Sequence, residues 1–471
     1  MSGLTTRIGL AWRALTRGGL EAGAGGRRWA DDRQMRDPGR AILTDASTIA
    51  ARAVGFVLNN PHGARIVEAA TSNLIGTGIT PRPLHPEEIA RGRLARNWTA
   101  WTDQADAEGR TDHYGQQATA VRDMVTFGEG LAIWTADPMN GAPQLRRLHP
   151  EQLDRAKSLL LTGGGSIVQG VEFSANGRIV AYWLRPHAPG DILAGMPLVS
   201  ERWPASEVIH LFRPLFPGQV RGLSWFAPVL LSAHELDQLI DAMLVRAKVA
   251  ALHAGFVVDA DGANPYGETT GIPPSVSLEP GAMVSLPPGK TVEFPDTPDQ
   301  GNAVGFATGI LRMIAAGAGV TYEMLTGDYS QVNYSSSRAA LLEFRRFAEQ
   351  VQHHTVIHQL CRPAWERFIR YQILAGNVPA AAYQRDRAAF GAKWLPPAWP
   401  WVDPQKDAAA AVLEMDNLLR SRAEIVAERG YDVEQVDAEI AADQARAAKL
   451  GLARKAPAAA ASSAPPPETV Q

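Results

Sequence analysis

One stretch of the chain, from Ser224 to His253, repeats apolar residues at helical spacing almost without interruption. Ser224 is a favourable helix N-cap, and Pro228 falls in the first turn, where a missing backbone N–H is tolerated. At about 1.5 Å per residue such a helix would extend roughly 45 Å, which is longer than a typical globular helix. The pattern therefore predicts a long structural helix over residues 223–253, and the rest of the fold must be arranged around it.

The residues before this helix combine helical and strand patterns. Asp45 is a candidate N-cap for a helix that Pro61 interrupts. Short β-prone runs follow, and Asn176-Gly177 between two of them predicts a type I′ hairpin turn. These runs are 131–135, 170–173, 179–183 and 208–212. Residues 45–222 are therefore expected to form one α+β domain.

Both ends of the chain have a composition that disfavours a packed core. Residues 1–44 contain several arginines and glycines and no continuous apolar segment of the kind found in signal peptides, so they are expected to form a flexible N-terminal arm. Residues 453–471 consist mostly of alanine, serine and proline, which cannot bury enough apolar surface to offset the entropy of ordering. A disordered tail is expected there.

The residues after the long helix divide into segments at prolines and glycines. Residues 254–300 are rich in both and carry three short strand candidates, 256–258, 283–286 and 291–294, which predict a small β insertion. A Gly/Ala-rich helix over 301–318, a loop over 319–335, a second long segment over 336–402 and a compact helical group over 403–452 follow. In the last group, Asp403-Pro404 predicts a helix start, Ser421 and Glu424 a capping box, and Asp432 the start of a final helix that ends at Gly451. The 336–402 segment should begin with a helix reaching Leu374, kinked at Pro363 because proline removes a hydrogen bond and clashes with the preceding turn.

The loop over 319–335 is a candidate contact site. Its second half, between two predicted helices, contains tyrosines and small polar residues without catalytic geometry: Tyr329, Ser330, Gln331, Val332, Asn333 and Tyr334. Loops held between rigid elements often carry binding function. We expect this loop to contact a partner rather than to perform chemistry.

The charge and cysteine content exclude some classes of protein. The chain has 471 residues, with 46 basic and 49 acidic residues and a net charge of -3, so it has no overall basic excess for wrapping nucleic acid. Any contact with DNA must be local. The single cysteine, Cys361, cannot form an intrachain disulfide, which fits a reducing cytoplasm.

The Gly/Ala-rich helix has glycines four residues apart, Gly301, Gly305 and Gly309. Such spacing occurs in membrane helices that pack closely, but Arg312 near the middle of an isolated span would cost about 2.5–3.5 kcal/mol. No membrane span is expected. The glycines instead indicate a helix that another helix approaches closely.

Motifs for enzyme chemistry are incomplete. Gly289-Lys290-Thr291 resembles the end of a phosphate-binding P-loop, but Val284 stands where that motif needs its first glycine. We interpret this stretch as a turn in which Lys290 presents a charge. His354, His358 and Cys361 lie at i, i+4 and i+7, so one helix face could offer three metal ligands. No other acid or cysteine nearby completes the set, and no catalytic residue, bound metal or cofactor is predicted.

The order of elements and several short motifs resemble the portal proteins of tailed bacteriophages, and most of all the lambda-type portal family. The motifs are Leu325-Thr326-Gly327-Asp328-Tyr329-Ser330, Asn333-Tyr334-Ser335-Ser336, Asn59-Asn60-Pro61, Asn73-Leu74-Ile75-Gly76-Thr77-Gly78 and Trp401-Val402-Asp403-Pro404. The resemblance covers roughly residues 45–452.

This resemblance implies a portal-type α+β fold. Residues 45–222 would be the wing, 223–253 and 301–318 two stem helices packed through Gly301, Gly305 and Gly309, and 254–300 the clip, with Lys290 at its tip. Residues 319–335 would be the tunnel loop, with Tyr329 to Tyr334 facing DNA. Residues 336–402 would return to the wing, and 403–452 would form the crown.

The resemblance also implies a function and partners. It implies a non-enzymatic homo-oligomeric ring, usually of twelve subunits, that forms the head-tail connector and DNA channel at one capsid vertex of the virion. Double-stranded DNA would pass through it during packaging and ejection. The terminase large subunit, the major capsid and scaffolding proteins and head-completion proteins would be its partners, and assembly would take place in the bacterial host cytoplasm. A monomeric metal-dependent hydrolase using His354 and His358, and an assembly chaperone without a channel, remain as alternatives.

Overall fold

The computed structural model of the protein describes residues 38–188, 199–251, 256–259, 290–293, 300–399 and 404–452. Within these ranges the chain forms two compact units. The first unit takes its residues from Met1–Thr71 and Thr119–Leu360, and the second from Ser72–Ala118 and Cys361–Gln471. Most of the predicted N-terminal arm and the predicted tail over 453–471 lie outside the described residues. The mixture of helices and sheets confirms the expected α+β class.

The first helix of the described chain begins earlier than the sequence predicts. Helix α2 spans Pro38–Asn59, so Asp45 lies inside it rather than at its N-cap, and residues 38–44 are helical rather than part of a flexible arm. The reason is that its buried residues, Ile42, Ala46, Ala50 and Ala53, start before Asp45 at helical spacing. Helix α3, Pro61–Leu74, follows at once because proline suits a first helical turn.

Gly39–Asn59 within α2 is also long and apolar enough to cross a membrane. This is weak support for a membrane span, because a helix packed on the core of a soluble protein can have the same length and composition. The buried positions of α2 follow the spacing of such a packed helix.

Two antiparallel sheets form the core of the first unit. A three-stranded sheet has the order β3-β2-β9, and a five-stranded sheet has the order β4-β5-β6-β7-β8. Their strands are β2 Glu129–Ala136, β3 Pro143–Leu148, β9 Val208–Phe212, β4 Leu159–Leu160, β5 Ser166–Val168, β6 Val171–Phe173, β7 Ile179–Leu184 and β8 Glu201–Pro204. The four predicted strand runs correspond to β2, β6, β7 and β9, whereas the other four strands were not predicted. One apolar cluster, including Ile133, Val171 and Tyr182, joins the two sheets.

The predicted hairpin at Asn176-Gly177 is present, but its turn is of another type. Only Gly177 has a positive φ, 74°, and five residues separate β6 from β7, so a two-residue type I′ turn is wrong there. A two-residue turn with positive φ at both positions occurs instead at Gln169 and Gly170, where φ is 45° and 85°. Gln169 is one of two non-glycine residues with positive φ among the described residues, so this hairpin is strained.

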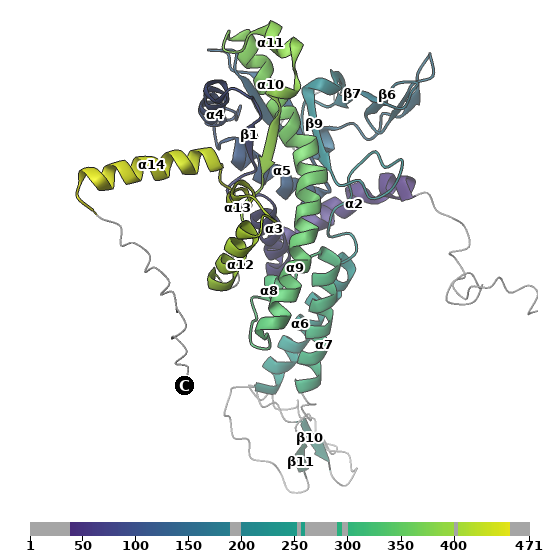
Figure 1. Cartoon of the computed structure of the whole chain (residues 1–471). Coiled ribbons are helices and arrows are strands. Elements are labelled where there is room, and N and C mark those ends of the chain that lie inside the picture. The colour runs from purple at the N-terminus through teal and green to yellow at the C-terminus, as the bar shows by residue number, and fades with distance from the viewer. Residues whose placement is uncertain are drawn as a thin grey trace, which may run out of the picture. The chain divides into compact units, whose positions relative to one another are not determined.

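Two antiparallel helices, α6 Leu230–Ala251 and α7 Gln300–Ala318, lie side by side (Figure 1). Helix α7 matches its prediction within one residue. Helix α6 begins six residues after Ser224, because Ser224 caps a preceding turn by accepting from the backbone nitrogen of Phe226 at 3.2 Å. Pro228 therefore precedes the helix. Strands β10 Phe256–Asp259 and β11 Lys290–Glu293 pair antiparallel and coincide with two of the three predicted strands, and the third lies outside the described residues.

The long helix predicted to reach Leu374 is divided into three parts. Helix α9 Tyr334–Val351 is followed by a π-helical segment, Gln352–Cys361, and by α10 Arg362–Leu374. The irregularity precedes Pro363, which stands at the start of α10. The proline cannot donate to the carbonyl four residues earlier, and a wider π-helical turn adapts to that loss.

The second unit is built around aromatic side chains. It contains a two-stranded antiparallel sheet and helices that carry a cluster of Trp98, Trp101, His113, Trp365 and Phe368. Its elements are β1 Thr80–Pro83, α4 Glu88–Thr102, the start of α5 His113–Phe127, α10, α11 Ala380–Arg385, the short 3₁₀ turn Ala388–Phe390 and β12 Ala392–Leu395. Strands β1 and β12 were not predicted. The two prolines of β1 make its sequence untypical of a strand, and β12 pairs only with β1.

The C-terminal helices begin and end where the sequence predicts. They are α12 Pro404–Asp416, α13 Arg422–Glu428 and α14 Val433–Lys449. Ser421 and Glu424 form the predicted capping box, and Asp432 caps α14 by accepting from the nitrogen of Glu434 at 2.9 Å. No residue of these three helices is buried within the described subunit. Within the described residues they therefore have little core of their own.

Candidate functional site

The predicted contact loop contains a short helix. Helix α8, Tyr322–Thr326, occupies its first half, capped by Thr321, which accepts from the nitrogen of Met324 at 3.2 Å. Gly327 closes this helix with φ 71°, a left-handed conformation that favours glycine. The segment is therefore a folded structure rather than a plain loop.

The second half of the loop supports itself through polar side chains. Asp328 accepts from the backbone nitrogen of Ser330 at 2.9 Å, and the hydrogen bonds from the side chain and the backbone of Ser330 lower the pKa of Asp328. Asn333 caps α9 by accepting from the nitrogen of Ser336 at 2.8 Å. Helix α9 begins at Tyr334, so Tyr334 belongs to the helix and not to the loop, since an asparagine cap fixes the helix start one residue before it.

The predicted contact residues are mostly exposed. Tyr329 is 60% exposed, and Ser330, Gln331 and Asn333 are exposed as well, whereas Val332 is partly buried. A tyrosine ring on the surface of a capped, self-bonded loop is available to a partner at little entropic cost. The structure thus brings Tyr329 to Asn333 together on one short exposed segment.

Helix α3 holds the base of this loop. The Nε of Arg65 donates to the carbonyl oxygen of Met324 at 2.9 Å, and Leu325 is buried with 2% exposure. Burial lowers the pKa of neighbouring His62, in spite of the opposing field of Asp237. His62 is therefore neutral near pH 7, and the loop base is fixed by packing and backbone contacts.

The glycines of α7 fall into two groups. A methyl group placed on Gly305 or Gly309 would meet no atom of the described chain within 4 Å, whereas one on Gly317 would collide with the side chain of Val229. Close packing inside the subunit therefore occurs at Gly317, which the sequence analysis did not single out. The predicted role of Gly301, Gly305 and Gly309 in close packing stays a prediction about a contact with another subunit.

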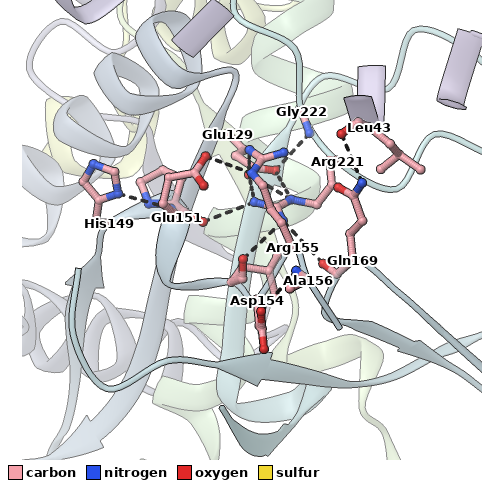
Figure 2. A network of polar contacts seen from close by, with 12 residues as sticks. Leu43, Glu129, His149, Glu151, Asp154, Arg155, Ala156, Gln169, Arg221 and Gly222 are labelled. Carbon is pink, nitrogen blue, oxygen red and sulfur yellow. Dashed lines mark hydrogen bonds and ion pairs between the residues drawn. The ribbon is translucent and has the colours of Figure 1, made fainter. Parts of the chain in front are cut away.

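A buried polar network lies where the three-stranded sheet meets the segment leading into α6 (Figure 2). Glu129 at the start of β2 is 1% exposed and Arg221 is fully buried. The carboxylate of Glu129 accepts from Nε of Arg221 at 2.9 and 3.0 Å, from Nη2 of Arg221, and from the backbone nitrogen of Gly222 at 2.9 Å. Nε2 of His210 lies 2.9 Å from the same carboxylate, and Nη2 of Arg155 lies 3.4 Å from it.

The electrostatics of this network follow from burial. Burial alone would raise the pKa of Glu129, but Arg221 and His210 hold it well below its usual value. Burial and the nearby Glu129 charge raise the pKa of Tyr182 to about 12. These residues are not predicted from the sequence, because they lie far apart in the chain. The available signal was a glutamate between Gly128 and Gly130 at the start of a predicted strand.

Comparison with known proteins decides the family. The profile of phage portal proteins of the lambda family matches residues 25–352, which is more than half of the chain. The chain belongs to this family. It is a portal protein, and the predicted resemblance is confirmed. Portal proteins of this family are structural components of the virion and not enzymes.

Named relatives agree with this assignment. The portal protein is 27% identical over 448 residues to the probable portal protein of Halomonas phage phiHAP-1, covering 90% of this chain and 85% of the relative. It is 24% identical over 498 residues to portal protein B of Escherichia phage lambda, covering 94% and 92%. Among solved structures, a chain from the neck of a native gene transfer agent particle matches with a TM-score of 0.44 and 15% identity, covering 74% and 92%.

The hydrolase alternative finds no support in this portal protein. His354 and His358 are exposed while Cys361 is fully buried, because the π-helical segment changes the spacing that would have placed them on one face. In the ranges that the structure describes, no group of three histidines, cysteines or acids could hold a metal ion. Lys290 begins β11 opposite Asp259, and its role at the clip stays a prediction.

Proposed function

We propose that this portal protein forms a ring of twelve subunits whose central channel carries double-stranded DNA into the capsid and later out of it. The observation that carries the proposal is the family match over residues 25–352, together with similarity to portal relatives over at least 90% of the chain. A net charge of -3 supports it, since a strongly basic channel would retain DNA through its phosphates.

The helices α6 and α7 support a contact between neighbouring subunits. Each carries large apolar side chains that the described residues leave exposed: Leu231, Leu244 and Val245 on α6, and Val304, Phe306 and Met313 on α7. A closed ring joins two different faces of each subunit, so two separate apolar faces are what such a contact needs. We assign α6 and α7 to the stem, with Gly305 and Gly309 admitting a side chain or helix of the next subunit.

The loop residues Tyr329 to Asn333 are assigned to the tunnel. They are exposed or partly buried, and the stretch from Gly327 to Tyr334 contains no lysine or arginine. A loop without basic residues can line the DNA path without binding phosphates strongly. Its hydrogen bonds at Asp328 and Asn333 hold it in one conformation, which suits a constriction.

The remaining assignments follow the same scheme. Residues 45–222 form the wing, 254–300 the clip with Lys290, 336–402 the return to the wing and 403–452 the crown. The terminase large subunit and the head-completion proteins bind successively at the clip end, and the major capsid and scaffolding proteins surround the ring. Assembly takes place in the cytoplasm of the bacterial host.

Imaging of the assembled particle tests this function. The chain is co-expressed with the capsid and scaffolding genes of its own genetic element, so that the ring forms under the conditions of assembly. Negative-stain images should show rings with a central hole, and native mass measurement should give twelve subunits. The proposal would be contradicted if the chain stayed monomeric in these preparations while the capsids still packaged DNA.

A further inference from the structure

The backbone of β2 and the segment leading into α6 cross in direct contact. A methyl group on Gly222 would overlap the carbonyl oxygen of Gly128, and one on Gly128 would overlap the backbone of Leu223 and Ser224. Gly128 has φ 95°, which side-chain-bearing residues rarely adopt. Both positions therefore need glycine, and they fix where the segment crosses the sheet.

Glu129 locks this crossing from the side of the sheet. Its carboxylate binds the backbone nitrogen of Gly222 as well as the side chain of Arg221, so it holds the segment at two consecutive residues. Arg221 also donates to the carbonyl oxygens of Leu153 at 3.3 Å and Pro150 at 3.2 Å. The buried pair thus connects the segment to β2 on one side and to the backbone at Pro150 and Leu153 on the other.

The segment continues rigidly from this point to α6. Oγ of Ser224 and the backbone nitrogen of Trp225 both donate to the carbonyl oxygen of Val125, at 3.3 and 3.1 Å. The Phe226 ring is fully buried and packs edge-on against Phe56 of α2, with centroids 5.4 Å apart. No residue between Gly222 and Phe226 is exposed, so the orientation set at Glu129 reaches the first turn of α6.

A second arm of the network reaches α2 through Gln169. The side-chain amide nitrogen of Gln169 donates to the carbonyl oxygen of Leu43 at 3.0 Å, and the backbone carbonyl oxygen of Gln169 accepts from Nη1 of Arg221 at 3.4 Å. Asparagine or glycine would suit this turn with positive φ better. Glutamine has the length to reach α2, which accounts for the strained residue.

The network has features that do not increase the stability of the folded chain. A buried ion pair often adds no net stability compared with apolar residues of the same size. Three of its buried polar atoms, Oε1 of Gln169, Nη1 of Arg155 and Nδ1 of His210, have no hydrogen-bond partner among the described residues. Such unsatisfied atoms are costly, so the arrangement favours a role in fixing one geometry.

We propose that the Glu129–Arg221 pair is a joint that fixes the direction in which α6 leaves the three-stranded sheet and, through Gln169, holds the N-terminal part of α2. When this ion pair is intact, the start of α6 moves together with the three-stranded sheet. The proposal concerns the geometry of a single subunit and holds whether or not the ring proposal is correct.

Distances between spin labels test the joint. In a Cys361→Ala background, Met139→Cys in the β2–β3 turn and Asp241→Cys on α6 place labels at two exposed positions. Labelled subunits are diluted with unlabelled ones, so that only distances within a subunit are measured. Arg221→Lys keeps the charge but loses the forked hydrogen bonds, and it should at least double the width of the distance distribution.

A control breaks another forked glutamate–arginine pair in the same unit, one whose arginine is partly exposed. Glu172 pairs with both Nε and Nη2 of Arg202 at 2.9 Å, within the five-stranded sheet and away from the segment leading to α6. Glu172→Gln should leave the distribution unchanged. Equal widths in Arg221→Lys and Glu172→Gln would overturn the proposal.

The second arm is tested separately, in a variant that should fold readily. Gln169→Asn suits the positive φ but is too short to reach Leu43. With labels at Met139→Cys and at Thr48→Cys on α2, the distance distribution should widen while the melting temperature does not fall. An unchanged distribution would show that Gln169 does not hold α2.

Discussion

Nε of Arg221 donates to both carboxylate oxygens of Glu129, at 2.9 and 3.0 Å, in a site that leaves 1% of Glu129 exposed. In a portal protein, such an ion pair between a strand and a distant segment is not part of any reaction. Mutation can separate its contribution to the free energy of unfolding from its role in fixing geometry. Removing one partner leaves a buried charge unpaired, whereas replacing both partners by apolar residues leaves none, so the two changes have different costs.

Removing one partner of this pair should destabilise the subunit strongly. Glu129→Gln leaves the buried Arg221 charge without compensation, and we expect a loss of about 3–5 kcal/mol in the free energy of unfolding. The double variant Glu129→Leu/Arg221→Met removes both charges and should lose clearly less. Urea unfolding of the first unit measures both. A double variant as unstable as Glu129→Gln would contradict this reading.

The same carboxylate should contribute to acid sensitivity. Because the pKa of Glu129 is lower in the folded state than the ordinary glutamate value of 4.5, its contribution to stability is fully present above that value. It is lost progressively as the pH falls below 4.5 towards the folded-state pKa. Glu129→Gln should therefore show a flatter dependence of stability on pH in this acid range than the unmodified chain.

His113 should make the second unit sensitive to milder acid. It is fully buried against Trp98, Trp101 and Tyr114, neither ring nitrogen has a hydrogen-bond partner among the described residues, and burial lowers its pKa from 6.5 to about 3. The unfolded chain takes up a proton below pH 6.5 and the folded chain does not, so stability falls as the pH drops from 6.5 towards 3.

At pH 5 the cost should be about 2 kcal/mol relative to pH 7. His113→Phe keeps an aromatic ring in the cluster and removes the titrating group. Thermal unfolding at several pH values should show a smaller slope between pH 6.5 and 5 for this variant. Identical slopes would mean that His113 is not neutral and buried in solution.

The sequence predicts well the elements whose information is local. Helix α7 is found within one residue, and the caps at Ser421 and Asp432 are where they were expected, because helix termini are specified by residues three or four positions apart. Strand β9 is found with its exact bounds for a similar reason, as a short β-prone run.

Features that depend on contacts between distant residues could not be predicted in this way. The start of α6 was placed six residues early, since nothing in the sequence near Ser224 shows that its hydroxyl donates to Val125. Strand β1, with two prolines, becomes a strand only through its pairing with β12. Glu129 and Arg221 are separated by 91 intervening residues, and charged residues are normally solvated, so no local pattern marks their burial.

Substitutions at two glycines of α7 should distinguish effects on subunit folding from effects on ring assembly. A methyl group placed on Gly309 would meet no atom of the described chain within 4 Å, and leucine has the higher helix propensity, so Gly309→Leu should stabilise the subunit by about 1 kcal/mol. If Gly309 faces the next subunit, rings should nevertheless be lost in negative-stain images. Gly317→Leu is the matched comparison, because its side chain collides with Val229 inside the subunit. It should lower the melting temperature, and normal rings from Gly309→Leu would refute the assignment of this face.

Replacing the exposed part of the loop should reduce DNA packaging without preventing ring formation. Tyr329 to Val332 are exchanged for a Gly/Ser linker of equal length, while Asn333 is kept because it caps α9. The loop then loses its fixed conformation and its aromatic ring, so rings should form but particles should contain less DNA. Ser421→Ala controls for a general loss of helix stability, since it costs about 1 kcal/mol at the cap of α13 and leaves the loop unchanged. DNA per particle is measured by nuclease protection. Normal genome filling in the linker variant would show that the loop does not act in the DNA channel.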